Sequence, residues 1–159
     1  MQRLHLHLPD EAATARLGAD LAQVLAPGLA IYLHGDLGAG KTALTRALLH
    51  AAGYQGRVKS PTYTLAEPYE VLFAGRMVTV IHFDLYRMSS PEEFLDAGFR
   101  EHFNENTVCI VEWPEKGATG LGHHGGVRGG GQAGVCGRVP GAALLMRTRP
   151  TSSRKLMHL

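Results

Sequence analysis

Hydrophobic and polar positions in the first third of the chain follow the periods of strands and helices in turn. Leucine alternates with polar residues over Leu4–Leu8, which predicts a short strand with one buried face. Apolar residues recur every three or four positions over Ala13–Val24, which predicts a helix capped by Asp10. The apolar run Leu29–Leu33 is typical of a strand covered on both faces, and Ala43–Ala52 predicts a second helix. A glycine-rich segment connects this strand to this helix.

The middle of the chain adds further strands and one more helix. Thr62–Glu70 and Met77–Asp84 are β-prone runs on either side of a glycine-containing stretch, and they predict a hairpin or two neighbouring strands. Ser90–Glu93 predicts a helix start, because serine favours the cap, proline the first turn and glutamate the capping box. Thr107–Val111 is another continuous apolar strand.

Composition limits the class of protein. The chain has 159 residues, the length of one ordinary domain, of which 45% are hydrophobic and 19% charged. These proportions exclude wholesale disorder and a coiled coil. No apolar run approaches the roughly 18 residues of a membrane-spanning helix, and Met1 is not followed by a signal-type apolar core, so we expect a soluble, cytoplasmic protein. The two cysteines are too few for a disulfide framework.

The overall charge of +2 conceals a division within the chain. Residues 1–115 carry 9 Lys and Arg against all 14 Asp and Glu, whereas residues 116–159 carry 7 Lys and Arg and no acid. The second part also holds 11 of the 20 glycines and no aromatic residue, so it has little with which to offset the entropy of ordering its backbone. We therefore predict an ordered domain over residues 1–117 and a Gly/Arg-rich tail over residues 118–159.

The tail has two candidate origins. A shifted reading frame in a GC-rich gene would produce a segment dominated by glycine, arginine and alanine, and this is the favoured hypothesis. The alternative is an RNA-binding tail, which its positive charge supports, although it has no aromatic residue for base stacking. A zinc site is rejected because His123, His124 and Cys136 lack the spacing of metal ligands.

Gly35–Thr42 matches the phosphate-loop pattern G-x-x-x-x-G-K-T between a predicted strand and a predicted helix. Its glycines let backbone N–H groups turn inward around an anion, and the following helix presents its N-terminal N–H groups to the same phosphates. Lys41 adds a mobile charge for the β and γ phosphates, and the Thr42 hydroxyl is suited to ligate Mg²⁺. The alternative is a glycine turn before a helix with Lys41 in solvent. The strand and helix on either side favour the phosphate site.

Two acidic residues follow predicted strands. Catalysis at a phosphate loop also requires an acid near the metal and a group that orients water, and such groups lie where strands end at the carboxyl edge of the sheet. Asp84 ends the run Val78–Phe83, and Glu112 ends the run Val108–Val111. From position alone, each carboxylate is equally compatible with capping a turn or lying in solvent beyond its strand.

Four segments, in order along residues 1–116, resemble the motifs of the bacterial TsaE (YjeE) family. The segments are Gly35–Thr42, Ser60–Leu65, His82–Arg87 and Val111–Glu115. The resemblance implies an α/β fold of the P-loop NTPase type, a three-layer sandwich with a mixed, mostly parallel sheet. It also implies an ATPase that acts with TsaB and TsaD to form N6-threonylcarbamoyladenosine at position 37 of tRNAs that read codons beginning with A. The tRNA would be reached indirectly, through the complex.

The resemblance also assigns roles to single residues. It implies that the catalytic residues are Asp84 and Lys41 and that the ligands of Mg²⁺ are Thr42 and Glu112. Ser60–Thr64 resembles a switch-like loop whose hydroxyls are able to bind metal, water or γ-phosphate, and the alternative is a polar turn that enters a strand. The residues expected to contact ATP are Gly35, Asp36, Leu37, Gly38, Ala39, Gly40, Lys41, Thr42, Ser60, Thr62, Thr64 and Trp113. For Trp113, simple packing or a partner surface are the alternatives.

Two other function classes fit a phosphate loop. A small-molecule kinase uses the same loop and Mg²⁺ for transfer to a hydroxyl, but 159 residues leave little room for a substrate lid, and residues 1–115 contain no separate Arg-rich lid segment. The other class is a nucleotide-sensing binding module with negligible hydrolysis. Members of the family continue with a proline-containing turn and one or two further strands, whereas residues 118–159 lack an alternating pattern, so no strand is predicted there.

Overall fold

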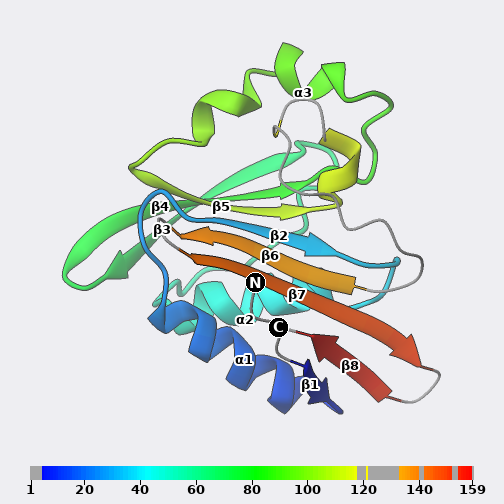
Figure 1. Ribbon diagram of the computed structural model, residues 1–159. Helices are drawn as coiled ribbons and strands as arrows, with labels where there is room; N and C mark the ends of the chain where they lie inside the picture. Colours follow the sequence, from blue (N-terminus) through cyan, green and yellow to red (C-terminus); the bar gives the residue numbers. More distant parts are fainter. Residues whose placement is uncertain (1–4, 118–120, 122–132, 140–141, 152–153, 159) are drawn as a thin grey trace.

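The computed structural model describes residues 5–117, 121, 133–139, 142–151 and 154–158, which form one mixed sheet flanked by helices (Figure 1). The strands are β1 (His5–Leu8), β2 (Ala30–His34), β3 (Ala66–Phe73), β4 (Arg76–Asp84), β5 (Thr107–Glu112), β6 (Ala133–Val139), β7 (Ala142–Thr151) and β8 (Arg154–His158). The helices are α1 (Glu11–Gln23), α2 (Lys41–Ala51) and α3 (Glu92–Asp96), with 3₁₀ turns η1 (Phe99–His102) and η2 (Pro114–Gly117). The strand order is β1-β8-β7-β6-β2-β5-β4-β3.

Parallel strands form the part of the sheet that carries the phosphate loop. β5 pairs parallel with β2 on one side and with β4 on the other. β3 adds an antiparallel hairpin to β4, and β6, β7, β8 and β1 continue antiparallel from β2. The predicted α/β fold is confirmed, and two of the three neighbouring pairs among β2, β5, β4 and β3 are parallel, as predicted. Over the whole described sheet antiparallel pairs predominate, because β6, β7 and β8 extend it.

Two hydrophobic clusters cover the two faces of the sheet. Val80 and Ile110 belong to the cluster beneath α1 and α2. Ile81, Phe83 and Phe94 belong to the second cluster, on the side of α3 and η1. Successive residues of β4 therefore enter opposite clusters, as the period of a strand requires. Figure 1 shows α1 and α2 on one side of the sheet and α3 on the other, which gives the predicted three layers.

The two helices on the first face approach each other closely. Asp10 caps α1 as predicted, because its Oδ1 accepts a hydrogen bond from the N–H of Ala13 at 2.8 Å. A Cβ placed on Gly18 of α1 would lie 2.6 Å from the Cβ of Ala47 in α2, so the close packing requires glycine there. Among the described residues, no helix has both the length and the apolar character needed to cross a membrane.

Two predicted element starts are wrong. β3 begins at Ala66, four residues later than predicted, because the preceding residues form a turn. In this turn the N–H of Leu65 donates to the carbonyl of Pro61 at 2.9 Å, and Leu65 has a φ of 61°. The helix predicted at Ser90–Glu93 is the short α3, which has Pro91 rather than serine at its cap position and no side-chain cap bond.

Strands β6, β7 and β8 lie after residue 118, where no strand was predicted. β6 pairs antiparallel with β2, and β8 pairs antiparallel with β1. Pairing of strands uses backbone N–H and C=O groups, which every residue except proline provides in full, so it does not require an alternating apolar pattern. The division into a domain over 1–117 and a foreign tail over 118–159 stays a prediction. His123 and His124 lie outside the described residues.

Candidate functional site

The phosphate loop connects β2 to α2 and has the backbone conformation that its glycines permit. Gly35, Gly38 and Gly40 have φ angles of 139°, 79° and 92°, in the region that side chains disfavour. Gly40 is the cap residue of α2, and no side chain caps that end of the helix. The free N–H groups and the positive end of the helix dipole therefore face the loop, which is the arrangement that binds phosphate.

The side chain of Lys41 folds back over the loop. Its Nζ donates to the carbonyls of Gly35 at 2.7 Å and Asp36 at 2.8 Å. It also lies 4.1 Å from the ring centroid of Trp113, which is cation–π distance. Lys41 is only 8% exposed, and burial lowers the pKa of its amine, although the nearby carboxylate of Glu112 opposes this shift. The ammonium of Lys41 thus lies within the loop in which it is predicted to bind phosphate.

Glu112 is the centre of a buried polar cluster at the end of β5. Its Oε1 accepts hydrogen bonds from Thr42 Oγ1 at 2.8 Å and from His82 Nε2 at 2.8 Å, and its Oε2 lies 3.1 Å from the same threonine hydroxyl. Glu112 is 2% exposed and His82 is fully buried. A buried carboxylate requires such partners, because desolvation of an unpaired charge is costly. The two predicted metal ligands, Thr42 and Glu112, are therefore in direct contact.

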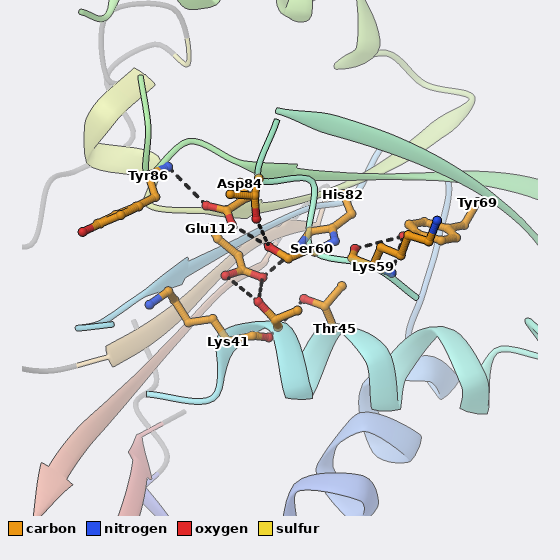
Figure 2. A network of polar contacts seen from close by, with 11 residues as sticks. Lys41, Thr45, Lys59, Ser60, Tyr69, His82, Asp84, Tyr86 and Glu112 are labelled. Carbon is orange, nitrogen blue, oxygen red and sulfur yellow. Dashed lines mark hydrogen bonds and ion pairs between the residues drawn. The ribbon is translucent and has the colours of Figure 1, made fainter. Parts of the chain in front are cut away.

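Asp84 lies beside this cluster and is bonded to the predicted switch-like loop (Figure 2). Its Oδ2 accepts from Ser60 Oγ at 2.9 Å, and Thr62 Oγ1 in turn donates to Ser60 Oγ at 3.2 Å. Its Oδ1 accepts from the N–H of Tyr86 at 3.2 Å. Two hydroxyls thus connect the loop to the carboxylate predicted to act in catalysis.

The register of the parallel strands brings the two acids together. Leu33 pairs with Glu112, and Glu112 pairs with Asp84, so β2, β5 and β4 contribute aligned positions. Along β4, Val78 and Val80 belong to the cluster beneath α1 and α2, and His82 and Asp84 continue the same alternation. The face that is apolar under the helices therefore becomes polar where it meets the phosphate loop.

A cleft of about 390 Å³ connects these groups. The residues that line it are Leu37, Gly38, Ala39, Gly40, Lys41, Thr42, Ala43, Ser60, Thr62, Asp84, Tyr86, Arg87, Glu112 and Trp113. Of the predicted ATP contacts, Gly35 and Asp36 do not line it and instead bind the Lys41 amine through their carbonyls. Thr64 also lies outside the lining, where its hydroxyl donates to Glu67 at 3.3 Å. These three contacts stay predictions.

One wall of the cleft is aromatic. The ring of Trp113 lies 5.0 Å from that of Tyr86, between centroids, and Lys41 lies over the same indole. Trp113 has a φ of 57°, which is rare for a residue with a side chain, and its N–H donates to the carbonyl of Leu33 at 3.2 Å. The bond to β2 fixes the turn after β5 and thereby the position of the indole at the mouth of the loop.

Sequence reasoning missed His82 as a member of the site and assigned no role to Tyr86 or Arg87. The signal for His82 was present in the alternation along β4, which brings a polar residue onto a buried face immediately before Asp84. Tyr86 and Arg87 follow the strand, and no periodic pattern indicates which way their side chains point. Their place in the cleft depends on the loop after β4.

The donors at this end of the sheet fit a hard cation such as Mg²⁺. Thr42 offers a hydroxyl and Glu112 a carboxylate, and Mg²⁺ prefers oxygen ligands and takes only one or two from protein side chains when phosphates complete its shell. In the described part of the chain, no group of three or more His, Cys, Asp and Glu side chains converges as a metal site. Thr42 and Glu112 therefore suit an ion that is held jointly with a phosphate ligand.

The fold and site define an α/β protein of the P-loop NTPase type. A strand leads through a glycine loop that ends in Lys-Thr to a helix, and adjacent parallel strands contribute the acids. More particularly, this chain belongs to the TsaE family. The sequence profile of that family, described as "Threonylcarbamoyl adenosine biosynthesis protein TsaE", matches residues 8–125. The chain is thus a member of a family involved in tRNA threonylcarbamoyladenosine biosynthesis.

Curated relatives and a solved structure agree with this assignment. The chain is 48% identical over 122 residues to the tRNA threonylcarbamoyladenosine biosynthesis protein TsaE of Haemophilus influenzae, covering 74% of this chain and 75% of that protein. It is 39% identical over 106 residues to the protein of the same name from Bacillus subtilis, covering 66% and 61% of the two chains. The fold matches a crystal structure of YdiB from Bacillus subtilis with a TM-score of 0.63 and 21% identity, over 99% of this chain and 84% of the other.

Proposed function

We propose that this protein is a Mg²⁺-dependent ATPase that supports TsaB and TsaD in forming N6-threonylcarbamoyladenosine at position 37 of tRNAs reading codons that begin with A. The observation that supports this most directly is the contact of Thr42 with Glu112 at 2.8 Å, next to the ammonium of Lys41. A phosphate-binding loop, a cation and a paired hydroxyl and carboxylate are the parts that ATP hydrolysis needs.

The loop and its lysine would bind the phosphates. Backbone N–H groups at the start of α2 would contact the β-phosphate, and the amine of Lys41 would exchange its carbonyl partners for β and γ oxygens. Thr42 and Glu112, whose side-chain oxygens lie 2.8 Å apart, would together hold the metal. When bound, Mg²⁺ supplies charge neutralisation at the β and γ oxygens.

Asp84 is suited to orient the attacking water and accept its proton. It is half-buried at the cleft, and its carboxylate accepts hydrogen bonds from Ser60 and from the backbone of Tyr86. A positioned carboxylate that acts in this way belongs to general base catalysis. Ser60 and Thr62 would place hydroxyls near the γ-phosphate without adding charge, so the loop would couple phosphate binding to the position of Asp84.

Release of phosphate from ATP without an added acceptor tests this function. The full chain is incubated with ATP and Mg²⁺, alone and with TsaB and TsaD, and phosphate is measured over time. We expect turnover that the two partners stimulate and that removal of the metal by a chelator abolishes. Phosphate transfer only when a small hydroxyl acceptor is added would identify a kinase instead. Tight nucleotide binding without turnover under any of these conditions would identify a nucleotide-sensing module.

A further inference from the structure

A second hollow of about 360 Å³ lies between α2 and the segment that follows it. Its lining residues are Arg46, His50, Arg57, Val58, Lys59 and Ser60. Arg46 and His50 lie one turn apart on the same face of α2, and Arg57 and Lys59 come from the segment that returns toward β3. Ser60 lines both this hollow and the nucleotide cleft, so the two are neighbours. We call the hollow, with its Arg46, His50, Arg57 and Lys59 side chains, the basic hollow.

The segment that carries two of these cations is held in place. Val58 is 4% exposed and anchors it in the core beneath α1 and α2. The buried hydroxyl of Tyr69 accepts from the N–H of Lys59 at 3.3 Å and donates to its carbonyl at 3.2 Å (Figure 2). His50 Nε2 donates to the carbonyl of Gly56 at 3.2 Å. Fixed backbone on both sides of the hollow means that little order has to be gained when an anion binds.

The positive charge of the basic hollow is uncompensated by carboxylates. All 14 Asp and Glu of the sequence lie between Asp10 and Glu115, within the described residues, and none of them lines the hollow. In the described part of the chain, Arg46, Arg57 and Lys59 form no ion pair. Residues 1–115 are acidic overall, so this gathering of cations is not a consequence of composition. Such a concave patch of one sign attracts anions and raises their local concentration.

We propose that the basic hollow binds the phosphate groups of an RNA strand. Two guanidinium groups offer planar forks that match phosphate oxygens, and Lys59 adds a point charge. An aromatic side chain outside the lining of the hollow favours a polynucleotide over an acidic peptide: Tyr63 follows Ser60 by three residues and is 86% exposed. The guanidinium of Arg87, which lines the nucleotide cleft, lies 5.0 Å from its ring centroid. A basic groove with an exposed aromatic platform is how proteins bind single-stranded nucleic acid.

RNA at this site would lie next to the nucleotide cleft without occupying it. Arg46, His50, Arg57 and Lys59 are absent from the lining of the cleft, and only Ser60 is shared. Substitutions of the three cations Arg46, Arg57 and Lys59 therefore separate RNA binding from ATP binding. Failure of the RNA site would leave the ATPase proposal intact, and the reverse also holds.

The proposal is tested by fluorescence anisotropy. A labelled single-stranded RNA of mixed sequence is titrated with the full chain at several salt concentrations. The triple variant R46A/R57A/K59A should lose affinity on the order of 100-fold at low salt. Its slope of log affinity against log salt should fall by about 2, at roughly 0.7 per lost phosphate contact. Tyr63→Ala should weaken binding without changing that slope, because stacking releases no counterions.

The matched control is R16A/R76A/R100A, which removes three exposed arginines elsewhere and changes the net charge equally. We expect it to bind RNA nearly as the parent chain does. An unchanged thermal midpoint and unchanged ATP affinity of R46A/R57A/K59A show that the variant is folded, and the milder single variants R57Q and K59Q provide the same test if it is not. Equal losses in the two triple variants, or no loss in either, would overturn the proposal. Tighter binding of a polyglutamate peptide with the same variant dependence would assign the hollow to an acidic protein partner instead.

Discussion

His82 donates a hydrogen bond from Nε2 to Oε1 of Glu112 at 2.8 Å, and both side chains are buried. The other ring nitrogen, Nδ1, is the one buried side-chain nitrogen or oxygen in the described part of the chain without a hydrogen-bond partner. The imidazole is therefore tied to a single acceptor, the carboxylate that also accepts from Thr42. This places His82 as a positioning residue behind the proposed metal ligand.

Replacement of His82 by leucine should raise the Mg²⁺ concentration needed for half-maximal ATP turnover by about 10- to 100-fold, because Glu112 loses the donor that orients it. His82→Gln should restore much of the affinity, since its amide offers an N–H at a similar reach. Titration of turnover with Mg²⁺ at saturating ATP measures the effect. Equal loss in both variants, accompanied by an equal fall in thermal midpoint, would mean that His82 serves only the fold.

Lys41→Ala should abolish productive binding and hydrolysis of ATP. The backbone N–H groups of the loop remain, but they cannot replace a mobile charge at the β and γ oxygens. Equilibrium binding of a fluorescent ATP analogue and phosphate release are the two measurements. Since Lys41 also bonds to Gly35 and Asp36, far-UV circular dichroism of the variant serves as the folding control. Near-normal turnover would reject the assignment of the phosphate loop.

The two acids should differ in what they affect. Asp84→Asn should leave nucleotide binding largely intact and slow hydrolysis on the order of 10²-fold, the scale of a positioned general base. Glu112→Gln should mainly weaken metal-dependent binding, because a neutral amide replaces a charged oxygen ligand next to Thr42. Single-turnover rates at saturating ATP separate chemistry from binding. The opposite pattern would interchange the two roles and keep the ATPase class.

Gly18→Ala should destabilise the domain by about 1–3 kcal/mol, because the added methyl group would meet Ala47 of α2 at 2.6 Å and force α1 away. Chemical denaturation followed by circular dichroism measures the free energy of unfolding. Ala47→Gly in the same chain removes the nearest atom but leaves backbone atoms at 2.8 Å, so it should restore only part of the loss. A Gly18→Ala chain as stable as the parent would show that the two helices separate at no cost.

A chain that ends at Gly117 should keep most of its stability and ATP affinity. The segment that this cut removes is rich in glycine and contains no Phe, Tyr or Trp, so we expect it to add little packing to the core. Limited proteolysis followed by thermal unfolding of the full and shortened chains with Mg²⁺ and ATP is the measurement. The result that would contradict a shifted reading frame is a tail that resists protease and whose removal lowers the midpoint of thermal unfolding by many degrees. That result would show that the pairing of β6 with β2 supports the sheet.

Local patterns predicted the parts of the site that lie on one continuous stretch of chain. The strand, loop and helix around Gly35–Thr42 follow one another in sequence, so spacing alone places their groups. Asp84 and Glu112 were found because the ends of parallel strands meet at one edge. The family resemblance assigned Thr42 and Glu112 to one metal, but their direct hydrogen bond was not predicted, because the two residues are 70 positions apart in sequence and meet through the register of β2 and β5.

The basic hollow and the position of Thr64 illustrate what periodicity omits. Arg46 lies on a helix and Arg57 on an irregular segment, and the two line one hollow only because Val58 and Tyr69 hold that segment against the core. Thr64 was grouped with Ser60 because Ser60–Thr64 resembles a switch-like loop, and in the structure the turn that ends at Leu65 directs its hydroxyl to Glu67. Irregular backbone has no period from which the direction of a side chain could be predicted.

The alignment of Leu33, Glu112 and Asp84 across three strands also limits how this family can change in length. An insertion of one residue within β5 would turn Glu112 to the opposite face of the sheet, among the phenylalanines of the second cluster, and would leave Thr42 without its partner. The same insertion in the β3–β4 turn near Gly75, an exposed connection distant from the cleft lining, would alter no site residue. Length variation among homologues should therefore be confined to the turns, and the register of β2, β5 and β4 should be preserved.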